Sequence, residues 1–297
     1  MSRDSDNYII SAIVSTYNAE RLIRGCLESL ENQTISDQLE IIVIDAASQE
    51  NEYSIVREFQ ARYDNIKYYR LDRRETVYQA WNRGIRLSRG KYITNANTDD
   101  RLRKDALERL VTALENHPEM ALAYGDCLVT ETENEQFDSC TPIGTYRMPD
   151  FSRNTLLSEC IVGPQPVWRR ALHDELGFFD EQYRCGADYE FWLRISERYN
   201  LLHVPDRLGL YLANKNGVSI KGDQPKKEMV AIQETYRKRF STIPHLKSGE
   251  LHLFRTVHRL HMGQPFVNVL ISESVSEGLR DYLLRLPCFT VHETSTR

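Results

Sequence analysis

The sequence lacks the segments that would anchor or cross-link the chain. None of its hydrophobic runs approaches the ~18–20 residues that a membrane-spanning helix needs. Its six cysteines are scattered and form no CxxC pair, which is typical of reduced thiols and excludes a disulfide framework. The opening residues are polar and charged, unlike a secretory signal. We therefore expect a globular protein of the cytoplasm.

An excess of basic charge is also missing. The 38 lysines and arginines are outnumbered by 43 aspartates and glutamates, which gives a formal net charge of −5. Proteins that bind nucleic acid through its phosphates need a basic surface, so the sequence predicts no nucleic-acid partner. No dense block of basic residues is present either, so we do not expect electrostatic attraction by itself to hold the protein on a membrane.

Strands and helices alternate along the first part of the chain. Short runs rich in β-branched residues predict buried strands over 8–15, 39–45, 66–71, 91–96 and 120–129, and apolar residues at helical spacing predict helices over 19–33, 54–63, 76–88 and 105–116. This alternation is typical of a mostly parallel central sheet flanked by helices, an α/β fold. Ligands of such sheets bind at the carboxyl ends of the strands.

The remainder of the chain is less regular. Residues 131–158 predict a polar loop or weak hairpin, followed by a strand over 162–168 and helices over 188–199 and 224–240. Apolar spacing after Pro244 predicts a helix near 251–261 and one or two more over 267–286. We therefore expect a domain over 1–243 and a helical appendage over 244–297. So short an appendage cannot bury its own apolar surface, so it should dock on the domain or form a homo-oligomer.

Polar side chains follow three of the predicted strands, at residues 15–18, 45 and 97–100. The first of these turns has no glycine, so a pyrophosphate cannot approach its backbone closely, and NAD or FAD is not favoured. Tyr17 could stack on a base, and Asp45 could accept hydrogen bonds from a ribose or a base. The alternative for Tyr17 and Asn18 is turn formation and helix capping.

The third of these turns contains two adjacent carboxylates. Asp99 and Asp100 repel each other unless a cation or water relieves them, and their oxygens suit Mg²⁺ or Mn²⁺. The alternative is that one of them caps the helix that begins near Lys104. Both roles can hold together, with one carboxylate for each.

Four sequence segments, in this order and spacing, resemble one protein family. They are VSTYNAERLIRGCLESLENQ from Val14, EIIVIDAASQE from Glu40, WNRGIRLSRGKYITNANTDD from Trp81 and GADYEFWLR from Gly186. Together they make residues 8–219 similar to a nucleotide-sugar-dependent glycosyltransferase of family 2, which has the GT-A fold.

The resemblance implies a donor site built from all three strand ends. The residues that would hold the nucleotide sugar are Ser15, Thr16, Tyr17, Asn18, Asp45, Asn82 and Asn97. Asp45 would contact the base, which is usually uracil in this family. Asp99 and Asp100 match the family's metal motif and would bind Mg²⁺ or Mn²⁺. Two positions depart from the family, because Asn97 replaces the usual first aspartate and Asn214 replaces a common histidine.

The resemblance also implies a catalytic base. The family's glutamate–aspartate pair matches Ala187 and Asp188, so the glutamate is missing and the aspartate remains. A carboxylate near the acceptor hydroxyl can take its proton as bonding develops, and attack opposite the leaving group inverts the anomeric centre. The alternative is that Asp188 only caps its helix.

We therefore expect an inverting, metal-dependent glycosyltransferase of the hexosyltransferase type. Its donor would be a nucleotide-diphosphate sugar, with UDP as the expected nucleotide. Its acceptor would be a saccharide or a lipid-linked molecule in cell-surface polysaccharide synthesis. With a lipid-linked acceptor, the alternative to a cytoplasmic location is a peripheral position at the inner face of the membrane. A sugar-phosphate nucleotidyltransferase is less favoured, since no Gly-rich basic loop follows the first strand. An inactive nucleotide-sugar-binding or scaffolding domain stays open because of Asn97, Ala187 and Asn214.

Overall fold

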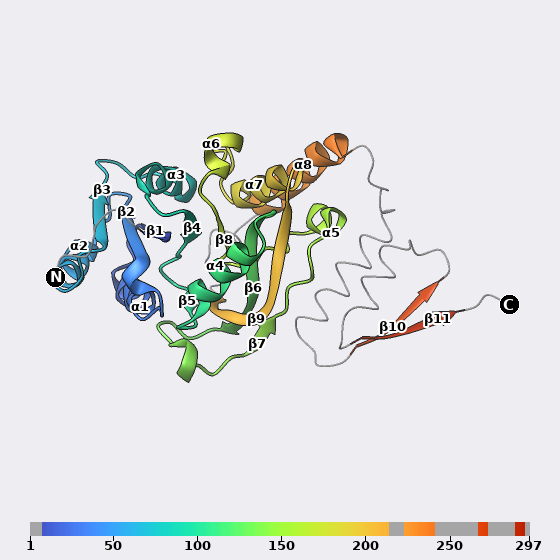
Figure 1. Cartoon of the computed structure of the whole chain (residues 1–297), viewed down its shortest axis with the longest axis horizontal. Helices are drawn as coiled ribbons and strands as arrows, with labels where there is room; N and C mark the ends of the chain where they lie inside the picture. The colour runs from blue at the N-terminus through green and yellow to red at the C-terminus, as the bar shows by residue number, and fades with distance from the viewer. Residues whose placement is uncertain (1–7, 214–222, 241–266, 273–288, 295–297) are drawn as a thin grey trace.

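The computed structural model describes residues 8–213, 223–240, 267–272 and 289–294 (Figure 1). Within these residues the central sheet has nine strands in the order β3-β2-β1-β4-β8-β6-β9-β5, with β7 paired to β6. Its strands are β1 (Ile10–Thr16), β2 (Leu39–Asp45), β3 (Ile66–Arg70), β4 (Tyr92–Asn95), β5 (Arg101–Leu102), β6 (Met120–Thr130), β7 (Gly144–Tyr146), β8 (Val167–Arg169) and β9 (Asn200–Leu212). Strands β1 to β4 pair in parallel, as do β6 and β9, so the prediction of a mostly parallel sheet is confirmed.

Helices cover both faces of the sheet, and each face has its own hydrophobic core (Figure 1). Strand β2 shows how the sequence produces this: Ile41 and Val43 belong to one core, and Ile42 and Ile44 to the other. Successive side chains of a strand point to opposite faces, so a run that is apolar at every position is buried on both. One core includes residues of α1 (Glu20–Glu31), α2 (Glu52–Gln60) and α4 (Ala106–Asn116), and the other includes residues of α3 (Val77–Leu87), α5 (Arg153–Ser158), α6 (Leu172–Leu176), α7 (Ala187–Ser196) and α8 (Gln224–Arg239).

The second half of the sheet departs from simple alternation. Strand β8 is antiparallel to both β4 and β6, and β6 pairs with β9 in parallel through an irregular register near Gly125 and Asp126. Strand β9 has 13 residues and had no predicted counterpart, because Pro205 and several charged residues interrupt its apolar pattern. The long pairing with β6 stabilises this strand, although its local sequence does not predict one.

The predicted C-terminal appendage is described only in part. Strand β10 (Val267–Ser272) pairs in parallel with β11 (Phe289–Thr294), so the prediction of helix is wrong for residues 267–272. The β-branched residues Val267, Val269 and Ile271 alternate with others, which favours a strand once a partner is present. Residues 241–266 and 273–288 lie outside the described part, so the domain boundary and the docking of the appendage stay predictions. Among the described helices, none is long and apolar enough to cross a bilayer.

Candidate active site

The turn that follows β1 is braced against the turn that follows β2. The amide of Asn18 donates to Ser48 Oγ at 3.1 Å, its side-chain Oδ1 accepts from the Gln49 amide at 2.7 Å, and the Ala19 amide donates to Glu52 Oε1 at 2.6 Å. Asn18 has φ of 51°, a left-handed conformation that asparagine tolerates. Its side chain bridges the two turns, and α1 has Ala19 at its N-cap, so the capping alternative for Asn18 is wrong.

Asp45 lies at the end of β2 and is fully buried. Its Oδ1 accepts from the Ser48 amide at 2.7 Å, and its Oδ2 accepts from Arg70 Nη1 at 2.9 Å and from the Tyr68 hydroxyl. Burial and this bond to Asp45 raise the pKa of the Tyr68 phenol. In this structure the carboxylate organises the turn and holds Arg70, whose side chain is 46% exposed. Contact between Asp45 and a base therefore stays a prediction.

The predicted nucleotide turn also borders α3. Trp81 Nε1 donates to Ser15 Oγ at 3.2 Å, and the Arg74 guanidinium lies 4.1 Å from the centre of the Tyr17 ring. Thr16 is buried, and among the described residues its hydroxyl has no hydrogen-bond partner. Arg74 and Tyr17 together offer a flat cation and a flat ring at this edge of the sheet.

Residues 97–100 follow β4, where the sequence placed them. Asp100 is buried, with Oδ1 accepting from the Leu212 amide at 3.2 Å and Oδ2 from Asn97 Nδ2 at 3.0 Å. Burial, followed by the nearby charge of Asp99, raises the pKa of Asp100 to about 8. Burial likewise raises the pKa of Asp99. Helix α4 has Asp105 at its N-cap, so the alternative that Asp99 or Asp100 caps it is wrong.

The oxygens of this loop fit a cation only in part. Both oxygens of Asp100 already accept hydrogen bonds, whereas the Asp99 carboxylate accepts none from another residue in the described part of the chain. Asn97 donates through its nitrogen, so its Oδ1 remains available. No cluster of three His, Cys, Asp or Glu side chains that could hold a metal occurs among the described residues. An ion here would need oxygens from a ligand such as a diphosphate, which is how Mg²⁺ is often bound.

Asp188 lies in the first turn of α7, where its side chain is half-buried. Its Oδ1 accepts from the Tyr78 hydroxyl at 2.9 Å and from the Tyr189 amide at 2.8 Å, while its Oδ2 has no partner among the described residues. Burial raises the pKa of the carboxyl, and these hydrogen bonds oppose that effect. The N-cap of α7 is Gly186, so Asp188 does not cap its helix.

Helix α3 connects the predicted base to the nucleotide turn. Tyr78, which binds Asp188, meets Trp81 edge-on with ring centres 5.4 Å apart, and Trp81 in turn binds Ser15. These four side chains make one continuous wall from the end of β1 to the start of α7. The predicted donor residues and the predicted base therefore belong to the same part of the molecule.

Asn82 was predicted to lie beside the donor, which stays a prediction, and in this structure its side chain bonds to the chain itself. Its side chain is buried, with Nδ2 donating to the Phe179 carbonyl and to Glu181 Oε1 and with Oδ1 accepting from the Phe179 amide. All of its hydrogen-bonding groups are engaged in holding the segment that precedes α7. Asn214 lies outside the described residues.

The family model for glycosyl transferase family 2 matches residues 11–176, more than half of the chain. The chain belongs to this family. The prediction made from the four resembling segments is thereby confirmed.

Curated relatives match the protein at 24 to 28% identity. The chondroitin synthase of Escherichia coli is 28% identical over 196 residues, which cover 66% of this chain and 28% of the synthase. An uncharacterized glycosyltransferase of Methanocaldococcus jannaschii is 24% identical over 195 residues, covering 65% of this chain and 67% of that protein. The hyaluronan synthase of Pasteurella multocida is 25% identical over 235 residues, covering 77% of this chain and 23% of that synthase. The chain thus spans about a quarter of the two synthases.

Solved structures establish the fold of this family 2 protein. The complex of S. aureus TarS with UDP-GlcNAc gives a TM-score of 0.62 at 15% identity, covering 84% of this chain and 72% of that one. The mannosyltransferase PcManGT of Pyrobaculum calidifontis, in complex with GDP-Man and Mn²⁺, gives 0.55 at 16% identity, covering 95% and 85%. The predicted GT-A fold is confirmed.

Two charged residues that support the candidate site in this family 2 protein were missed by sequence reasoning. Arg101 is almost fully buried, and its guanidinium donates to the carbonyls of Thr98 and Asp100 and to Asn134 Oδ1, which fixes the 97–100 loop. Nothing in its sequence context separates it from a solvated arginine. Glu228 of α8 accepts from the amides of residues 184, 185 and 186, just before Asp188. Its spacing from buried Ile232 and Tyr236 was a usable signal.

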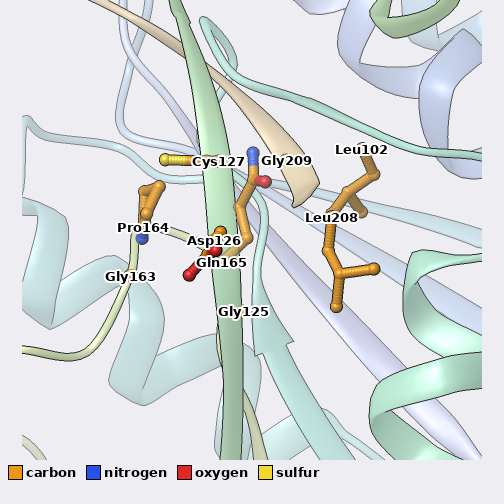
Figure 2. A pocket seen from close by; sticks show the side chains of 9 residues that line it. All are labelled: Leu102, Gly125, Asp126, Cys127, Gly163, Pro164, Gln165, Leu208 and Gly209. Carbon is orange, nitrogen blue, oxygen red and sulfur yellow. The ribbon is translucent and has the colours of Figure 1, made fainter. Parts of the chain in front are cut away.

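A small cavity is lined by residues of β5, β6 and β9 and of the segment just before β8 (Figure 2). Its lining residues are Leu102, Gly125, Asp126, Cys127, Gly163, Pro164, Gln165, Leu208 and Gly209. The space suits about one water molecule, and the buried Gln165 Oε1 has no partner among the described residues. A water there would satisfy Gln165, and the cavity is too small for a sugar.

Proposed function

We propose that this protein is an inverting glycosyltransferase that moves a sugar from a nucleoside-diphosphate sugar, UDP-linked, to a hydroxyl of a saccharide or lipid-linked acceptor. The observation that carries the proposal is Asp188, a half-buried carboxylate whose Oδ1 accepts two hydrogen bonds and whose Oδ2 has no partner among the described residues. It is joined through α3 to the turn predicted to hold the nucleotide.

Asp188 is proposed as the general base. Its free Oδ2 would take the proton of the acceptor hydroxyl while the hydroxyl oxygen bonds to the anomeric carbon, and the carbon–oxygen bond to the nucleoside diphosphate would break with its electron pair leaving on the diphosphate. Because burial raises the pKa of this carboxyl, its anion is a better proton acceptor than an exposed carboxylate. Attack from the side opposite the diphosphate gives inversion.

The donor is proposed to lie along the ends of β1, β2 and β4. The Tyr17 ring would stack on the base, and Arg70 and Arg74 would place positive charge near the phosphates. The complex of a similarly folded protein with UDP-GlcNAc supports a UDP-linked donor. Similarity to chondroitin and hyaluronan synthases supports a role in polysaccharide synthesis.

A divalent cation is proposed to bind at residues 97–99. The Asp99 carboxylate and Asn97 Oδ1 would hold Mg²⁺ or Mn²⁺, whose charge would neutralise the departing diphosphate. Asp100 would contribute by fixing Asn97 and the Leu212 backbone, because its oxygens already accept hydrogen bonds from both. The Mn²⁺ in the mannosyltransferase complex with GDP-Man supports this part of the proposal.

Transfer from a panel of nucleotide sugars, with and without Mn²⁺, tests the proposal. We expect transfer from a UDP-sugar, stimulated by Mn²⁺, and a loss of about 100-fold or more in Asp188→Asn with unchanged UDP affinity. Asp37→Asn is the matched control and should transfer normally, because Asp37 is exposed and lies just before the amino end of β2. Full activity of Asp188→Asn would exclude it as the base. Tight UDP binding without transfer by the unaltered protein would favour the inactive-binder alternative instead.

A further inference from the structure

Tyr78 contacts Asp188 from a different element of the fold. Its hydroxyl donates to Asp188 Oδ1 at 2.9 Å, although the two residues are 110 positions apart in the chain. The Tyr78 side chain is only 3% exposed, so water does not compete for this bond. Tyr78 also lies outside the four segments that carry the resemblance to the family.

The position of the Tyr78 ring is fixed by packing and by the start of its helix. The ring meets Trp81 edge-on at 5.4 Å and Phe179 at 5.9 Å between ring centres. At the N-terminus of α3, Thr76 and Gln79 form a reciprocal capping box that holds the first helical turn, which contains Tyr78. The Tyr78 hydroxyl is therefore held in one position and cannot follow the carboxylate if that group rotates.

Geometry at Asp188 separates its two oxygens. Both hydrogen bonds, from the Tyr78 hydroxyl and from the Tyr189 amide, end on Oδ1. Rotation of the carboxylate would break both bonds, so Oδ2 stays directed away from them. An unconstrained carboxylate would exchange its oxygens freely and spend part of its time in unproductive orientations.

We propose that Tyr78 is a positioning residue, whose hydroxyl holds Oδ1 of Asp188 so that Oδ2 faces the acceptor hydroxyl. This inference rests on the proposed function of Asp188 as the base and adds the residue that orients it. Tyr78 itself touches neither donor nor acceptor in this account.

The surroundings of Asp188 determine what loss of the Tyr78 hydroxyl would do. The groups that oppose the effect of burial on the pKa of Asp188 are the Tyr189 amide, the Tyr78 hydroxyl and the backbone of Asp188 itself. The other titratable side chains that its charge reaches are the thiols of Cys160 and Cys185, whose pKa values it raises. Because the hydroxyl stabilises the charged carboxylate, its removal should raise the pKa of Asp188 further.

Tyr78→Phe removes this hydroxyl and keeps the ring. We expect the acidic limb of the kcat/KM profile to move to higher pH by about 1 unit, and kcat at pH 7 to fall by about 10-fold, with the donor KM within about twofold. A second readout does not depend on activity: the side-chain carboxyl ¹³C resonance that is absent from Asp188→Asn should titrate at higher pH in Tyr78→Phe.

Tyr124→Phe is the matched control, because it removes another buried tyrosine hydroxyl, which donates to the Pro149 carbonyl at 2.7 Å and takes no part in the hydrogen bonds of Asp188. We expect it to reduce stability without moving the acidic limb or the carboxyl titration. The positioning role would be overturned if Tyr78→Phe moved neither the acidic limb of the kcat/KM profile nor the carboxyl titration. If Asp188→Asn still abolished transfer, the proposed function would stand. Absence of transfer by the unaltered protein with every donor would instead overturn the proposed function.

Discussion

The roles of the acidic residues at the strand ends are decided by their hydrogen-bond partners. Asp45 has three partners and Asp100 has two, so both act on the protein around them. Asp99 and Asp188 each keep oxygen atoms without partners in the described part of the chain. An oxygen without a hydrogen-bond partner is the one most readily available to take up a proton or a cation. This difference separates the two acids proposed for chemistry from the two that support them.

His173 is a buried histidine whose hydrogen bonds require the neutral form. Its Nε2 accepts from Trp168 Nε1 at 2.9 Å, its Nδ1 lies 3.1 Å from the Gly177 carbonyl, and its ring stacks on Phe191 at 4.7 Å. Burial lowers the pKa of this imidazole to about 4. A proton on Nε2 would face the indole N–H and break the first of these bonds.

We predict that His173 makes the protein sensitive to acid. Between pH 6.5 and about 4 the unfolded chain binds a proton at this histidine and the folded protein does not, so stability is present above pH 6.5 and falls as the pH falls. The loss reaches about 3 kcal/mol at the lower end. Urea unfolding at several pH values would measure it, with His173→Gln as a reference that cannot titrate. Parallel pH dependences for the two proteins would contradict the prediction.

At the scale of elements, α8 holds the start of α7 in place. One carboxylate, Glu228, accepts backbone hydrogen bonds from residues 184 to 186 at 2.8 to 3.1 Å. At Gly186 a Cβ atom would lie 2.8 Å from Ile232 Cδ1, so the two elements approach as closely as glycine allows. The position of Asp188 therefore depends on a helix that begins more than 30 residues later in the chain.

We predict that Glu228→Gln destabilises the protein by about 2 kcal/mol, because hydrogen bonds to a charged acceptor are stronger than those to an amide oxygen. It should also reduce transfer, since the segment that carries Asp188 loses its anchor. Denaturant unfolding and initial rates would measure both effects. Glu234→Gln changes an exposed residue of the same helix and should alter stability by less than about 0.5 kcal/mol. Equal effects of the two substitutions would exclude the anchoring role.

At the scale of the whole molecule, the family domain and the C-terminal part are distinct in the sequence. The family model ends at residue 176, while the described GT-A sheet and helices continue to residue 240. Beyond it the described part contains only the parallel pair β10 and β11. An isolated pair of strands is marginally stable in water, so we expect this part to gain its stability from other surfaces.

Removal of residues 243–297 should therefore have a measurable consequence. We predict that a chain ending at Thr242 is less stable than the full chain or forms an oligomer of fewer protomers in solution. The reason is that apolar surface expected to pack against the appendage becomes exposed. Thermal unfolding and light scattering would measure the two effects. Unchanged stability together with an unchanged oligomeric state would show that residues 243–297 dock on neither the domain nor a second copy.

The sequence by itself determined the elements that rest on local patterns. Strands β1 to β4 and the helices between them are confirmed, because uninterrupted β-branched runs and helical apolar spacing act within a few residues. The positions of Asp45, Asp99 and Asp188 at the ends or beginnings of elements were also predictable. Their partners were not, since hydrogen bonds such as Tyr78 to Asp188 join residues far apart in the chain.

Only the tertiary structure decided how strands with mixed sequences pair and which polar groups stay free. Strand β9 exists through its pairing with β6, and residues 267–272 are extended because they pair with 289–294. Arg101 and Glu228 became supporting residues because burial left them no water and gave them backbone partners. The physical reason is common to all of these: the free energy of a buried polar group or a strand depends on what it contacts, and the fold chooses those contacts.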